Sequence, residues 1–126
     1  MKVDPRAIVD AYIDALANYD YERARGLLAD SGFRYQSPIS RFTSADEFMQ
    51  YMSLSGGIIQ GIGRRKTFVD GDDVCHFLEF AVQLSEKESF RVVQWASVAK
   101  GRIYRIEVLF DAHRYHEMFQ LDPEGA

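Results

Sequence analysis

The sequence predicts an α+β fold in which a curved antiparallel sheet wraps around N-terminal helices. Apolar residues recur at helical spacing in the first half of the chain, and from about Gly57 their period changes to two. Long extended segments then follow one another with short turns between them, which is the pattern of an antiparallel meander. Helices that precede a meander pack on one face of its sheet, and long strands twist and make that sheet curl.

Two helices are expected at the N-terminus. Asp4 and Pro5 open the first, because Asp accepts from free amides and Pro suits the first helical position. Its apolar face is formed by Ile8, Ala11, Tyr12, Ala15 and Leu16. The second helix is expected near residues 20–30, and Gly32 can adopt the left-handed conformation that ends it.

A short strand and a third helix are expected next. Residues Phe33–Ser37 alternate like a strand, which Pro38 stops. Ser44 and Glu47 then form a capping box at the start of a helix. This helix places three apolar residues on one side: Phe48, Tyr51 and Met52.

The second half of the chain predicts four strands. They are expected at Ile58–Val69, Val74–Gln83, Phe90–Val98 and Ile103–Phe110. The turns between them are expected at Asp70–Asp72, Ser85–Glu88 and Lys100–Gly101. Gly61 and Gly63 allow a bend or bulge in the first of these strands. Residues Asp111–Leu121 are expected to form a short closing helix or an arm.

Length, charge and composition set the class of protein. The 126 residues fit one domain, 1–126, and we expect 121–126 to be a flexible tail. A net charge of −4 argues against nucleic acid as a partner. The single Cys75 excludes an intrachain disulfide, and no run reaches the ~18 apolar residues that a membrane span needs. The start of the chain lacks the apolar segment of a secretory signal, so a cytoplasmic location is expected.

Several local motifs are spread over nearly the whole chain: Ala11–Leu16, Tyr19–Glu22, Leu27–Asp30, Tyr35–Pro38, Val69–Val74, Lys100–Ile103 and Leu109–Asp111. Together they resemble the nuclear transport factor 2-like superfamily, particularly its SnoaL-like branch. The resemblance implies a cystatin-like cone that encloses a pocket. It implies no single activity, because the superfamily contains ketosteroid isomerases, polyketide cyclases, epoxide hydrolases, binding proteins and dimerisation modules.

The resemblance also suggests roles for three polar residues. Tyr12 falls where the ketosteroid isomerases keep their oxyanion-hole tyrosine, although a helix-face aromatic can equally pack in the core. Ser37 stands where those isomerases carry an aspartate base, and a hydroxyl is a very poor base, which disfavours an isomerase of that type. Gln94 lies near the position of their second acid, and it can form hydrogen bonds but cannot titrate.

Two other residues are candidate bases. His76 shares strand parity with Leu78 and Phe80 and should point inward, either as a general base or as a satisfied core histidine. Asp111 ends the last strand, near where the SnoaL-type cyclases place an acidic residue, but an Asp there can equally cap the next segment. With His113 and His116 it forms only a weak chelating pattern, so we expect no metal and no cofactor.

These residues predict a protein that binds a small, largely apolar molecule in the cone pocket, with or without acid–base chemistry. The candidate catalytic residues are Tyr12, His76 and Asp111. The candidate ligand-binding residues are Tyr12, Ser37, Phe48, Tyr51, Met52, His76, Gln94 and Phe110. The alternative is a non-catalytic binding or dimerisation module, and the residues leave open whether the chain is an enzyme.

The opposite parity of the meander predicts an interaction surface. This outer face holds Phe77, Glu79, Ala81, Val93, Trp95, Ser97 and Leu109. Large apolar groups on an outer sheet face need cover, and aromatic residues dominate the energetics of interfaces. We therefore expect a homodimer through this face, centred on Trp95, unless the strand parity is inverted and Trp95 lines the pocket.

Overall fold

The structure, a computed structural model, describes residues 3–119. Its helical elements are α1 (Pro5–Ala17), α2 (Tyr21–Gly26), α3 (Ala45–Ser55), the 3-10 turn η1 (Gly56–Ile58) and α4 (Ala112–Phe119). Its strands are β1 (Arg34–Gln36), β2 (Arg41–Phe42), β3 (Ile59–Asp70), β4 (Asp73–Gln83), β5 (Lys87–Ala99) and β6 (Arg102–Leu109). The tail expected at residues 121–126 lies outside the described residues.

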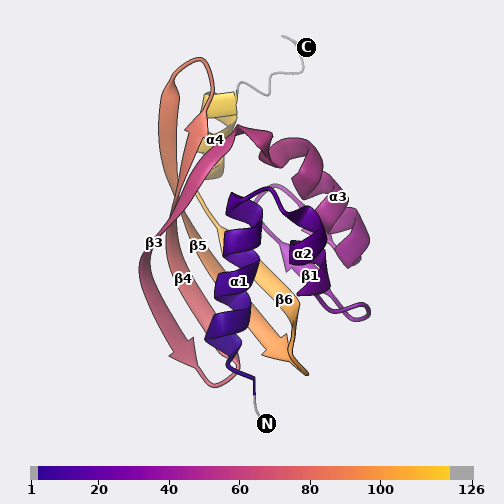
Figure 1. The fold of residues 1–126 in the computed structure, drawn as a ribbon. Helices are drawn as coiled ribbons and strands as arrows, with labels where there is room; N and C mark the ends of the chain where they lie inside the picture. The colour runs from indigo at the N-terminus through magenta and orange to yellow at the C-terminus, as the bar shows by residue number, and fades with distance from the viewer. Residues whose placement is uncertain (1–2, 120–126) are drawn as a thin grey trace.

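All six strands belong to one sheet, in the order β2-β1-β6-β5-β4-β3. Strands β3 to β6 form the predicted antiparallel meander, whereas β1 pairs in parallel with β6, with Tyr35 opposite Ile106. Figure 1 shows the long strands bending around α1, with α2 and α3 on the same side of the sheet. The predicted α+β fold, a curved antiparallel sheet wrapped around N-terminal helices, is therefore confirmed.

Side chains cap α1 and α3 as the sequence predicts. The carboxylate of Asp4 accepts a hydrogen bond from the Arg6 backbone N–H at 3.0 Å, and Pro5 occupies the first helical position. The Ser44 hydroxyl accepts from the Glu47 backbone N–H at 3.2 Å. Each cap satisfies a donor that the first turn of a helix otherwise leaves without a partner.

The second helix is shorter than predicted. It ends at Gly26 rather than near residue 30, although Gly32 does have a positive φ of 73°. The chain after the helix pairs instead with β6: the Ile103 N–H donates to the Leu27 carbonyl at 2.9 Å, and the Ala29 N–H donates to the Ile103 carbonyl at 2.8 Å. These long-range backbone hydrogen bonds override the local helical pattern.

Strand boundaries differ from the prediction at a few places. Neither β2 nor η1 was expected, and β5 begins at Lys87, inside the predicted turn, because Lys87 pairs with Gln83. In β3 one register shift adjoins Gly61, as predicted, but the second lies between Arg64 and Lys66 rather than at Gly63. A helix or an arm was expected after Leu109, and the structure has the helix, α4.

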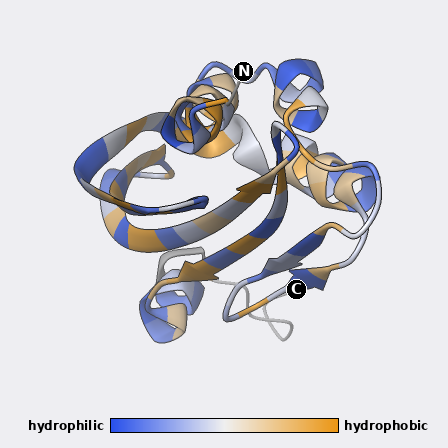
Figure 2. Cartoon of the chain, turned by 90° about the horizontal axis from the view of Figure 1, so that it is seen from below, coloured by the Kyte–Doolittle hydropathy of each residue, from blue (hydrophilic) through white to orange (hydrophobic). Residues whose placement is uncertain are grey.

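The core lies between the helices and the concave face of the sheet. Apolar and polar residues alternate along the long strands, as the coloured bands in Figure 2 show. On β4 the inward residues Val74, His76 and Leu78 are buried, and on β5 Trp95 is 40% exposed on the opposite face. The predicted strand parity is therefore correct. No helix in residues 3–119 is both long and apolar enough to cross a bilayer.

Candidate functional site

An inner cavity of about 300 Å³ lies between the helices and the concave face of the sheet. Helices α1 and α3 form one wall, strands β4 to β6 form the opposite wall, and the segment after β1 and helix α4 contribute residues at its edges. Its lining includes Tyr12, Leu16, Tyr35, Ser37, Ile39, Ser40, Phe48, Tyr51, Met52, Ser55, Phe80, Val82, Phe90, Val92, Gln94, Val108, Phe110 and Tyr115. This volume is at the small end of the range that proteins use for small molecules.

Aromatic rings form much of this lining. The ring of Phe48 stacks on that of Tyr35 with 4.3 Å between centroids, and the rings of Phe80 and Phe90 stack at 5.5 Å. Phe110 meets Phe90 edge to face at 6.2 Å. Mutual packing fixes these rings, so the cavity presents flat, rigid apolar walls.

The polar groups of the cavity are neutral. Among the described residues, its lining contains no Asp, Glu, Lys, Arg or His. Burial raises the pKa of Tyr12 well above its ordinary value and raises the pKa of Tyr35 to about 12. Both phenols therefore stay protonated at neutral pH and can donate hydrogen bonds. Gln94, 6% exposed, adds an amide from the sheet side.

Seven of the eight predicted ligand-binding residues lie in this lining. Tyr12 faces the cavity from α1, and Gln94 faces it from β5. Ser37 lies at the edge, where its hydroxyl accepts from the backbone N–H groups of Ile39 and Ser40 at 3.2 and 3.1 Å. Ser37 thus holds the turn between β1 and β2 together. Whether any of these residues binds a ligand stays a prediction.

His76 is the eighth, and it does not line the cavity. Its side chain is fully buried, with Nε2 2.9 Å from Oδ1 of Asp10. Arg64 bonds the same carboxylate oxygen at 3.1 Å and reaches Asp14 at 2.7 Å. Burial lowers the pKa of His76, and this effect outweighs the opposing attraction of Asp10. The imidazole is therefore neutral at pH 7 and lies in a polar cluster beside the cavity.

Asp111, the third predicted catalytic residue, also lies outside the lining. Its carboxylate accepts from the Arg114 backbone N–H at 3.1 Å and caps α4. On the same helix, His113 lies 3.6 Å from Glu117. Within residues 3–119, no three or more His, Cys, Asp or Glu side chains lie close enough together to hold a metal ion.

Sequence reasoning missed several residues of the site. Tyr35, Phe90 and Tyr115 line the cavity, and Asp10 is the partner of His76. Phe90 shares strand parity with Gln94, so its inward direction was available from the sequence. Tyr35 shares strand parity with Ser37, so its direction was available in the same way. Tyr115 and Asp10 had no such signal, because their contacts join distant segments.

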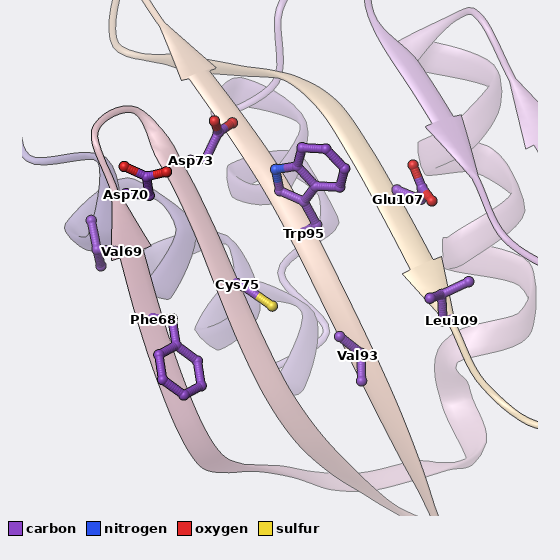
Figure 3. Close-up of a pocket in the computed structure, with 9 residues that line it drawn as sticks. All are labelled: Phe68, Val69, Asp70, Asp73, Cys75, Val93, Trp95, Glu107 and Leu109. Atoms are coloured by element: carbon purple, nitrogen blue, oxygen red, sulfur yellow. The ribbon is translucent and has the colours of Figure 1, made fainter.

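A second hollow lies on the convex, outer face of the sheet and measures about 560 Å³. We call it the outer groove, and it is lined by Phe68, Val69, Asp70, Asp73, Cys75, Val93, Trp95, Glu107 and Leu109. Figure 3 looks onto this face, with the helices behind the sheet. Because Phe68, Trp95 and Leu109 are exposed, the groove is an apolar surface open to solvent.

Comparisons with known proteins establish the fold. No family model and no curated protein matches the chain. Among solved structures, a nuclear transport factor 2-like protein of unknown function from Cytophaga hutchinsonii superposes with a TM-score of 0.77 at 20% identity, over 91% of this chain and 96% of that one. The chain has the nuclear transport factor 2-like fold. The resemblance predicted from the sequence is thereby confirmed in fold.

Solved structures with this nuclear transport factor 2-like fold include proteins of different kinds. An LEH-like epoxide hydrolase from M. tuberculosis has a TM-score of 0.75 at 22% identity, over 90% of this chain and 85% of that one. A Catenulispora acidiphila protein with a ketosteroid isomerase-like fold, in complex with trimethylamine, has a TM-score of 0.73 at 13% identity, over 82% of this chain and 85% of that one. At these identities the likeness concerns the fold, so the activity must be argued from the site.

Proposed function

We propose that the chain binds a small, uncharged and largely apolar molecule in the inner cavity. One observation carries this proposal: the cavity is lined by aromatic and aliphatic side chains, and its polar groups are phenols, hydroxyls and one amide. A charged ligand would lose its hydration without gaining an opposite charge among the described lining residues, which is unfavourable. A neutral molecule gains apolar burial and one or two hydrogen bonds.

The same lining favours binding over acid–base catalysis. A general acid or base needs a pKa near the working pH and must come within hydrogen-bond reach of the ligand. His76 and Asp111 were the predicted bases, but His76 faces Asp10 and Asp111 caps α4. Tyr12 faces the cavity, but burial raises its pKa, which suits it to donate a hydrogen bond.

Titration calorimetry with 2-naphthol, a small fused-ring probe, tests the proposal. Met52 is half-buried in the α3 wall, and Met52→Trp should fill the cavity and weaken binding by tenfold or more. Leu54→Trp is the matched control, because Leu54 lies on the same helix and is 81% exposed. Circular dichroism checks that both variants fold. No binding of 2-naphthol, or equal binding by both variants, would contradict the proposal.

A second candidate function is dimerisation through the outer groove. The exposed rings of Phe68 and Trp95 and the side chain of Leu109 lie on one sheet face, which favours an apolar partner surface. A two-fold interface places the same patch of both copies in contact, so the patch must be complementary to itself. The exposed apolar side chains meet this condition, and the ion pair with Arg105 offsets the charge of Glu107 in the groove lining. We propose a second copy of the chain as the partner.

A further inference from the structure

Two enclosed nitrogen atoms without hydrogen-bond partners lie on neighbouring strands. His76 on β4 and Gln94 on β5 are directly opposite one another in the antiparallel register, and both side chains face inward. His76 Nδ1 and Gln94 Nε2 are each shielded from solvent, and neither has a partner among the described residues. Buried polar atoms nearly always have partners, so two such atoms on facing residues require an explanation.

One of these atoms is an acceptor. His76 Nε2 lies 2.9 Å from Oδ1 of Asp10, and an ionised carboxylate can only accept, so Nε2 carries the ring proton. The charged groups around the ring are Asp10, Arg64 and Arg6, and burial keeps the imidazole neutral by lowering its pKa. In a neutral ring with the proton on Nε2, Nδ1 has a free lone pair.

The other atom is a donor. Gln94 Nε2 carries two N–H groups, and of the two terminal amide atoms only this nitrogen is both enclosed and unpaired. Facing residues of an antiparallel pair have Cβ atoms about 4.5–5.5 Å apart, and the terminal torsion of glutamine is broad. A rotation of the Gln94 amide can therefore direct Nε2 to Nδ1 of His76.

We propose that Asp10, His76 and Gln94 form a hydrogen-bonded relay that turns the Gln94 carbonyl oxygen into the inner cavity. The cavity then selects ligands that present a hydroxyl or N–H donor to Gln94. This inference rests on the proposed function, because it names the ligand class of the same cavity. His76 acts in it as a positioning residue and does not touch the ligand.

The relay determines which ligands fit. A free glutamine amide can flip and offer either its oxygen or its nitrogen to a ligand. When Nε2 is bound to His76, a ligand oxygen without a proton would face the Gln94 oxygen, and both acceptors would lose their partners. Leaving a buried acceptor unpaired corresponds to a loss of about tenfold in affinity or more.

Two probes of similar shape measure this selectivity. 2-Naphthol can donate a hydrogen bond, and 2-methoxynaphthalene can only accept one. By calorimetry on the full chain at pH 7.5, we expect 2-naphthol to bind about tenfold more tightly. In Gln94→Leu and His76→Phe the ratio of the two affinities should fall towards one. His113→Gln is the control, because this histidine is exposed on α4, and it should leave the ratio unchanged.

Nitrogen NMR on the unmodified protein tests the relay without a ligand, in case the His76 variant does not fold. We expect His76 to show a protonated Nε2 and a hydrogen-bonded, unprotonated Nδ1, and we expect Gln94→Leu to shift the Nδ1 resonance. A protonated Nδ1, an unshifted resonance, or equal binding of both probes would overturn the relay. If neither probe binds, the proposed function fails instead, and the NMR result alone decides the relay.

Discussion

The guanidinium carbon of Arg105 lies 3.8 Å from the centroid of the Trp95 ring on the outer face of the sheet. Arg105 also pairs with Glu107 at 2.7 Å, which holds the guanidinium over the indole. Attraction between a cation and the face of an aromatic ring fixes the ring in one orientation. Arg105 therefore restrains Trp95 in the outer groove, which in the proposed dimer would lower the entropy lost when the second copy packs on this ring.

Fluorescence of Trp95 should report dimer formation. It is the only tryptophan of the chain and is 40% exposed, so burial against a second copy should shift its emission to shorter wavelengths as protein concentration rises. Sedimentation velocity should show a doubled mass over the same concentrations. Leu109→Arg should weaken the dimer at least tenfold, whereas Leu54→Arg, on α3, should not. A monomer with constant emission at every concentration would rule out the dimer.

Replacing Arg64 should destabilise the protein more than replacing its neighbour Arg65. Arg64 binds the Asp10 carboxylate and backbone carbonyl as well as Asp14, which joins β3 to α1. Arg65 forms no ion pair within the described part of the chain. Urea unfolding should give a loss of about 1 kcal/mol for Arg64→Met, because the pairs are partly exposed, and less than about 0.5 kcal/mol for Arg65→Met. Equal losses would contradict the structural role of Arg64.

Stability should fall as the pH is lowered through the range in which histidine titrates. Burial lowers the pKa of His76 below its ordinary value of 6.5, so at acidic pH the unfolded chain binds a proton more readily than the folded one. The contribution of this residue is complete above pH 6.5 and is lost below it, until the folded form is protonated too. Urea unfolding at pH values from about 5 to about 8, the range in which histidine ordinarily titrates, measures how the free energy of unfolding changes with pH.

Two variants identify His76 as the source of that slope. His76→Phe removes the titrating group and should flatten the pH dependence. His116→Gln, which changes an exposed histidine of α4, should leave the dependence as it is in the unmodified protein. A slope that persists in His76→Phe would assign the effect to another group.

Replacing two glycines by alanine should change the stability of the protein differently. At Gly56, which follows α3, an added Cβ would overlap the hydroxyl of Tyr21, although the backbone angles are ordinary. Gly56→Ala should therefore cost about 1–2 kcal/mol, and Tyr21→Phe in the same chain should recover part of it. Gly26 has open space around it, so Gly26→Ala should be neutral or stabilise the protein by up to about 1 kcal/mol. Thermal unfolding compares them.

Much of the fold followed from periodicity alone. The 3.6-residue spacing of α1 placed Tyr12 on the face that packs against the sheet, and the two-residue spacing of β5 placed Gln94 inward and Trp95 outward. Periodicity thus placed Tyr12 and Gln94 in the cavity lining, because the direction of a side chain in a regular element follows from its position. Predicted and observed boundaries agreed best where such spacing was long and regular.

Contacts between distant segments could not be predicted. Nothing near Asp10 in the sequence indicates that it lies beside His76 and Arg64, because α1 meets β3 and β4 only after the sheet has curled. The shortened α2 has the same origin, since Leu27 pairs with Ile103 instead of continuing the helix. A single sequence shows local preferences, whereas the conformation and the partners of these residues depend on pairing between distant segments.

The parallel pairing of β1 with β6 has a consequence for the order of folding. Strands β3 to β6 join through short hairpins, whereas the contact of Tyr35 with Ile106 closes a loop that contains most of the chain. Contacts between residues so far apart form slowly, because the chain loses much entropy before it gains them. Tyr35 also lines the cavity, so the cavity is completed only at this late step. In the proposed binding function, a bound ligand would therefore slow the separation of β1 from β6.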